Sequence, residues 1–146
     1  MARNDDSYDI IWLVRRLFRA MAQRADRELE DFGISAADRA VMEFLHPDTA
    51  LTVPEIAARY QVSRQHVQVT VNRLLDAGYL VTRENPRHKR SPLIALSTSG
   101  RALFRKIRTR EAKLIEAAFA GTSSRDREVT RDTLGVLLSR FGEQAK

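Results

Sequence analysis

The 146-residue chain is 43% apolar, an ordinary share for one globular domain with a buried core, so a wholly disordered chain is excluded. It has no cysteine, which excludes disulfides, thiolate metal sites and thiol redox sensing. The formal net charge of +6 is uneven: residues 52–110 hold twelve Lys and Arg against three Asp and Glu, residues 1–51 seven against ten, and residues 111–146 six of each.

A basic excess confined to the middle of the chain creates a local positive field. Nucleic acid is the first candidate partner, an acidic membrane surface is the second, and a solvated basic face without a partner is the remaining alternative. The polar amino terminus and the short apolar run IIWLV predict neither a signal sequence nor a membrane span. We therefore expect a cytoplasmic protein.

The first predicted element is a long amphipathic helix over residues 8–31, which Gly33 ends. Its apolar positions recur at three- and four-residue spacing. They are Ile10, Leu13, Val14, Leu17, Met21, Ala25 and Leu29. Met21 and Met42 are expected to be core residues.

Two shorter helices each open with a capping box, in which the first residue and the residue three positions later cap each other. Ser35 and Asp38 begin the helix that ends before Pro47, and Thr52 and Glu55 begin the next one. That helix ends near residue 59. The apolar positions of the two helices are Val41, Met42, Phe44, Leu45, Ile56 and Ala57.

The segment QVSRQHVQVTVNRLLDAGYL, residues 61–80, predicts a fourth helix that Ser63 caps and Gly78 ends. Its inner stripe is Val67, Val71, Leu74 and Leu75. The opposite face carries Arg64, Gln65, Gln68, Val69 and Arg73. Such side chains suit a major groove, because Gln pairs with adenine, Arg binds guanine or phosphate, and a methyl group meets the thymine methyl. A surface helix with polar residues outward is the alternative.

The order of the elements favours DNA recognition. A short helix, a turn at residues 60–62 and a second helix form a helix-turn-helix. Short strands at residues 80–84 and 93–97 then form a hairpin around NPRHKRSP. A hairpin after a recognition helix is a wing, and a basic wing tip can reach a neighbouring minor groove or its phosphates.

Two more amphipathic helices close the chain, one from Ser97 to about Ala120 and one after residues 123–126. The first has Leu103, Ile107, Leu114, Ala118 and Phe119 on its apolar side, and the second has Val129, Leu134, Leu137, Leu138 and Phe141. These two helices and the first helix each have an apolar stripe, and all three stripes must be buried. A two-fold partner that uses the same helices is the commonest solution, and an intramolecular three-helix bundle is the alternative.

Nearly the whole chain resembles the MarR-type winged helix-turn-helix regulators of bacteria and archaea. The resemblance rests on VMEFL, on LTVPEIAARYQVSRQHVQVTVNRLLDAGYLVTRENP and on the exit LIALSTSG. The family's wing usually reads Asp-Pro-x-Asp-x-Arg, and Arg90 matches its arginine. Asn85 and His88 stand where the family has aspartates, which puts the usual wing salt bridge in doubt. The resemblance implies dimerisation through the terminal helices.

We therefore expect a mainly α fold with a small β-hairpin wing: a winged helix-turn-helix at residues 35–97, between dimerisation helices at residues 1–34 and 98–146, in one integrated domain. The expected function is that of a homodimeric, sequence-specific DNA-binding transcriptional regulator, a repressor acting at a pseudo-palindromic operator. The expected DNA-binding residues are Thr52, Ser63, Arg64, Gln65, His66, Gln68, Val69, Arg73, Arg87, His88, Lys89 and Arg90. The alternative is a winged helix for architectural DNA binding or protein contacts.

No catalytic role, metal or cofactor is expected, because the three histidines lie on different elements and the usual catalytic motifs do not occur. His66 is expected to touch phosphate or to pack locally. The family often binds small aromatic anions beside the dimerisation helices, and Trp12, Arg16 and His46 are the candidates to line such an effector site. A helix face in the dimer core with a solvated edge is the alternative for this group.

Overall fold

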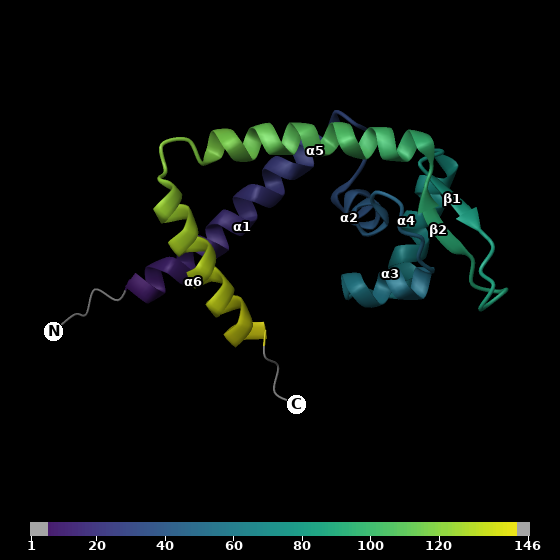
Figure 1. Cartoon of the computed structure of the whole chain (residues 1–146), viewed down its shortest axis with the longest axis horizontal. Helices are drawn as coiled ribbons and strands as arrows, with labels where there is room; N and C mark the ends of the chain where they lie inside the picture. The colour runs from purple at the N-terminus through teal and green to yellow at the C-terminus, as the bar shows by residue number, and fades with distance from the viewer. Residues whose placement is uncertain (1–5, 143–146) are drawn as a thin grey trace. The chain divides into compact units, whose positions relative to one another are not determined.

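The computed structural model describes residues 6–142, which form helices and one two-stranded hairpin (Figure 1). In chain order the elements are α1 Asp6–Glu30, α2 Ala36–Leu45, α3 Val53–Tyr60, α4 Arg64–Asp76, β1 Leu80–Arg83, β2 Leu93–Leu96, α5 Thr98–Ala118 and α6 Ser124–Gly142. The mainly helical fold with a hairpin is confirmed, and each element lies close to its predicted bounds. The chain divides into two compact units after Arg108, inside α5.

The predicted helix starts are confirmed by their side-chain caps. Ser35 Oγ accepts from Asp38 N at 3.1 Å, while the Asp38 carboxylate accepts from Ser35 N at 2.9 Å. Thr52 and Glu55 form the same reciprocal pair at the start of α3, and Ser63 Oγ accepts from His66 N at 3.1 Å. Each cap satisfies amide donors that have no partner inside the helix, and for this reason short local sequence signals fixed the helix starts.

The core of the first unit lies among α2, α3, α4, the hairpin and the first turns of α5. Its fully buried side chains include the predicted Val41, Met42, Leu45, Ile56, Val67, Val71 and Leu74. Phe104 and Ile107 from α5 complete it, so the beginning of α5 belongs to the same core as the helix-turn-helix.

The apolar stripe of α1 behaves differently from the other predicted stripes. Leu29, in the last turn, is its one buried residue. Met21 is 55% exposed, so the expectation that Met21 is a core residue is wrong for the single chain. Helix α6 likewise has no buried residue within its described length. The helical spacing of apolar residues correctly predicted which residues form each stripe. It does not determine whether other parts of the same chain bury that stripe.

The hairpin pairs antiparallel, with Leu80 opposite Leu96 and Arg83 opposite Leu93. A second partner was not predicted: Leu51, just before α3, exchanges two backbone hydrogen bonds with Ile94, at 3.0 and 2.7 Å. These bonds join the base of the wing to the entrance of the helix-turn-helix. The two parts are therefore held together by backbone as well as by apolar packing.

The exit from the wing is fastened to the end of α4. Ser97 Oγ and Ser99 Oγ both donate to the Gly78 carbonyl, at 2.6 and 2.9 Å, and Ser97 N donates to Tyr79 O. Gly100 lies directly against this junction, because a Cβ added to it would meet Tyr79 O at 2.0 Å. Glycine is needed here for close backbone approach.

Replacing Gly100 by alanine should therefore destabilise the protein by about 1–3 kcal/mol, since backbone must move to admit the methyl group. The midpoint of urea unfolding measures the effect. Gly135→Ala, within α6, is the matched control, because among residues 6–142 nothing outside the adjacent helix backbone lies within 4 Å of the added Cβ, and alanine favours a helix. Equal unfolding midpoints for the Gly100 variant and wild type would contradict the packing described here.

Candidate nucleic-acid interface

Helices α3 and α4 form the predicted helix-turn-helix. The turn spans residues 61–63, and Gln61 adopts the left-handed conformation at φ 59° that ends α3. Val62 N donates back to Ala57 O at 3.2 Å, and Ser63 then begins α4. Because Val67, Val71 and Leu74 are buried, the opposite side of α4 faces solvent.

The outward side of α4 carries the side chains expected to read bases. Gln65, Gln68 and Val69 are all exposed, Val69 by 56%. Gln68 Nε2 donates to Asn72 Oδ1 at 2.8 Å, one turn along the same helix. This bond orients the Gln68 amide before any ligand arrives. Asn72 was not among the expected site residues, although its i+4 spacing from Gln68 is a usable signal.

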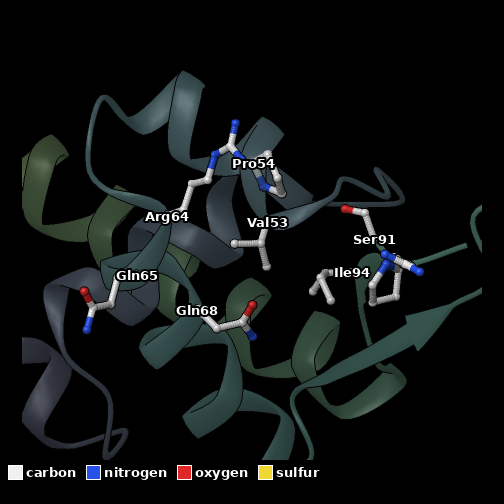
Figure 2. A pocket seen from close by; sticks show the side chains of 9 residues that line it. Val53, Pro54, Arg64, Gln65, Gln68, Ser91 and Ile94 are labelled. Carbon is white, nitrogen blue, oxygen red and sulfur yellow. The ribbon is translucent and has the colours of Figure 1, made fainter. Parts of the chain in front are cut away.

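A hollow of about 410 Å³ lies between α4, the start of α3 and the wing (Figure 2). Its apolar lining comes from the start of α3 and from the wing, and its polar lining comes from α4 and the wing. The lining residues are Val53, Pro54, Arg64, Gln65, Gln68, Arg90, Ser91, Pro92 and Ile94. None of them is acidic, so the hollow joins two guanidinium groups and two amides around an apolar floor. The tertiary structure thus brings the predicted wing arginine beside the predicted recognition helix.

A second hollow, of about 790 Å³, adjoins the wing tip and shares Pro54, Arg64 and Ser91 with the first. Arg87 and His88 line it from the wing, and Thr52 and Glu55 line it from the start of α3. Thr52 is only 6% exposed, and its hydroxyl donates to Glu55 Oε1 at 3.0 Å. The structure therefore gives Thr52 a capping role at the edge of this hollow.

Asn85 organises the wing tip. Its Nδ2 donates to Ser91 O at 3.0 Å, and its Oδ1 accepts from Arg87 N at 3.1 Å. One amide thus spans the tip from side to side and holds the turn that carries the basic residues. A carboxylate at this position has no hydrogen to donate to Ser91 O. The bond from Asn85 to Ser91 O therefore requires the amide, and an aspartate at position 85 would not make it.

The remaining expected site residues lie in other surroundings. Ser63 caps α4, and His66 lies with its ring 6.3 Å from that of Tyr60. Lys89 is exposed on the wing tip. Arg73, at the far end of α4, forms an ion pair with Asp38. The expectation that Arg73 reads a base is untested, but its guanidinium has a partner within the chain.

The three candidates for an effector site do not line either hollow. Trp12 and Arg16 lie one turn apart on α1 and are exposed, whereas the His46 ring packs against Phe104 in a tilted arrangement, with 4.8 Å between ring centroids. His46 Nδ1 is buried and has no hydrogen-bond partner within the described residues.

Within residues 6–142, no cluster of three or more His, Asp or Glu side chains could hold a metal ion. No helix in the same range has the length and apolarity needed to cross a membrane.

Comparison with known proteins gives consistent matches. The model of the MarR family matches residues 32–91. An uncharacterized protein of Mycobacterium bovis is 37% identical over 87 residues, which are 60% of this chain and 61% of that protein, so the match spans about three fifths of the relative.

Solved structures match over most of the chain. The crystal structure of a MarR family transcription regulator has a TM-score of 0.89 at 26% identity, covering 95% of this chain and 92% of that one. The crystal structure of the S. aureus MepR–DNA complex has a TM-score of 0.76 at 24% identity, covering 88% of this chain and 96% of that one.

Replacing Asn85 by alanine should loosen the wing tip, because both of its tip-closing hydrogen bonds are lost. We expect trypsin to cut the native protein after residues 87, 89 and 90 about tenfold faster than in wild type, since two such bonds together contribute on the order of 1–3 kcal/mol. Asn72→Ala, which removes an amide from α4 instead, serves as the control. Unchanged cleavage in the Asn85 variant would show that the amide does not hold the tip.

Proposed function

We propose that this chain, whose residues 32–91 match the model of the MarR family, is a homodimeric, sequence-specific DNA-binding transcriptional regulator that represses from a pseudo-palindromic operator. The observation that carries the proposal is the hollow between α4 and the wing, where Gln65 and Gln68 lie with Arg64 and Arg90. Amides discriminate base edges in the major groove, while arginines bind phosphates or the minor groove. Such a protein would act in the cytoplasm.

The composition of this surface favours base reading over architectural binding. An architectural protein frequently inserts apolar side chains as wedges between base steps. Here the outward face of α4 presents two glutamines, and one of them is already held by Asn72. Protein contact or architectural binding without an operator remains the second candidate.

The exposed stripe of α1 supports the homodimer. Eight large apolar residues of α1 are at least 39% exposed: Tyr8, Ile10, Trp12, Leu13, Val14, Leu17, Phe18 and Met21. Helix α6 adds Val129, Leu134, Val136, Leu138 and Phe141. Several exposed large apolar residues on one helix mark an interaction site, and a second copy related by a two-fold axis is the commonest partner. Two recognition helices would then meet an inverted repeat with half-sites about 10 bp apart.

Relief of repression by a small aromatic or anionic effector is the last part of the proposal. Trp12 and Arg16 offer an aromatic face and a cation at i,i+4 spacing on α1, and His46 offers an unpaired ring nitrogen. These residues remain candidates for such a site.

Arg90→Ala and Gln68→Ala should weaken DNA binding in different ways, because phosphate contacts are insensitive to sequence and base contacts are not. Arg90→Ala should weaken binding to operator and scrambled duplexes by similar factors and lower the slope of log affinity against log salt by about one. Gln68→Ala should cost about 1–3 kcal/mol on the operator alone and leave the slope unchanged.

Titrations at several salt concentrations measure both variants on a duplex selected by the wild-type protein from a random-sequence library, and on its scrambled counterpart. If Arg90→Ala binds both duplexes like wild type, the wing does not contact DNA. If the library yields no preferred sequence, the architectural candidate is favoured.

Placing two glutamates in the α1 stripe, by Leu13→Glu and Leu17→Glu, should convert the dimer to a monomer at micromolar concentration, because burying unpaired carboxylates opposes association. Sedimentation equilibrium measures the change. Val81→Glu, on an exposed apolar residue of the wing, should leave the dimer intact and is the control. A wild-type protein that is already monomeric would refute the dimer.

A further inference from the structure

Asp38 is a charged residue enclosed by the core. It is 3% exposed, although it lies in the first turn of α2. Its two carboxylate oxygens have separate partners: Oδ2 accepts from Ser35 N, and Oδ1 accepts from the guanidinium of Arg73. The first bond caps α2, whereas the second reaches a residue 35 positions later in the chain.

Two nitrogen atoms of the Arg73 guanidinium donate hydrogen bonds to Asp38 Oδ1. Nε lies 3.1 Å and Nη2 2.5 Å from Asp38 Oδ1. The arginine side chain is about half exposed, and its partner carboxylate is buried. Burying a carboxylate without a paired cation costs free energy, so a movement of α4 that separates Arg73 from Asp38 would destabilise the protein. The pair therefore favours one position of α4 against α2.

We propose that the Asp38–Arg73 pair is a positioning device for the reading face of α4, and that Arg73 contributes to DNA recognition through this pair rather than by touching a base. This inference rests on the proposed function. Arg73 lies one helical turn after Val69 and two turns after Gln65, on the same side of α4. The end of the reading stripe is thus attached to the body of the protein.

The pair supplies a constraint that the apolar core does not. Val67, Val71 and Leu74 hold α4 against the core, but apolar contact has no preferred direction and tolerates small sliding and rotation. A two-donor bond to a single carboxylate oxygen is directional and fixes one register. Base reading needs side chains placed to within a fraction of an ångström, so a loosened register should reduce discrimination between sequences.

Two single variants and their combination test the proposal. Asp38→Asn removes the charge but keeps an oxygen that can accept from Ser35 N, so the cap of α2 is retained. Arg73→Met keeps the length of the side chain without its donors. The probes are a duplex that the wild-type protein selects from a random-sequence library and a scrambled version of that duplex. Thermal unfolding, monitored by circular dichroism, identifies a temperature at which every variant is folded, and binding is measured there.

Asp38→Asn should weaken binding to the selected duplex about tenfold, leave the scrambled duplex unaffected and leave the salt slope unchanged. Arg73→Met should do the same, and the double variant should lose no more than either single variant, because both remove one interaction. Arg64→Met is the matched control: it removes an arginine of the same helix that lines both hollows, and its loss should add to that of Asp38→Asn.

A different pattern would overturn the proposal. If Asp38→Asn binds like wild type while Arg73→Met alone loses affinity and lowers the salt slope by about one, Arg73 is a direct DNA contact. If Asp38→Asn weakens both duplexes equally, the pair serves stability alone. If the wild-type protein selects no preferred sequence from the library, both the proposed function and this inference are wrong. The selection is carried out before any variant is measured, so this outcome is separate from the results with the variants.

Discussion

Helix α4 has a buried apolar side and an exposed polar side, and the packing of the first unit keeps the two separate. One side buries Val67, Val71 and Leu74, each of which stabilises the fold by about 1.5–3 kcal/mol. The other side must stay accessible and polar to meet a ligand. Helices α2 and α3, the hairpin and the first turns of α5 all pack on the buried side, so they leave the face with Gln65 and Gln68 open.

The position of the wing is also fixed by the packing of this unit. Leu51 pairs with Ile94 through backbone hydrogen bonds, so the base of the wing is continuous with the entrance of α3. This connection brings Arg90 and Arg64 to the lining of one hollow, which also has apolar lining residues. Two guanidinium groups and two side-chain amides thereby share one concave surface, a combination suited to a duplex.

Polar contacts divide into two kinds in this unit. Caps such as Ser35 and Ser63 are local, and their partners lie three residues away. The Asp38–Arg73 pair joins two helices distant in sequence. In the sequence, Asp38 was identified as a capping residue and Arg73 as an outward, DNA-binding side chain of the fourth helix, and neither was predicted to pair with the other. No spacing rule connects them, because their proximity depends on how α4 crosses α2.

The sequence by itself determined the helices, their caps, the hairpin and the buried face of α4, because three- and four-residue periodicity, capping boxes and turn glycines act over a few residues. It also identified Arg64, Gln65, Gln68 and Arg90 as candidates for one surface. Only the tertiary structure decided that these four line a single hollow, that Asn85 closes the wing tip, and that the α1 stripe, Met21 included, is exposed in the single chain. These features depend on where separate elements meet, and a periodic pattern shows which face of a helix is apolar but not what covers it.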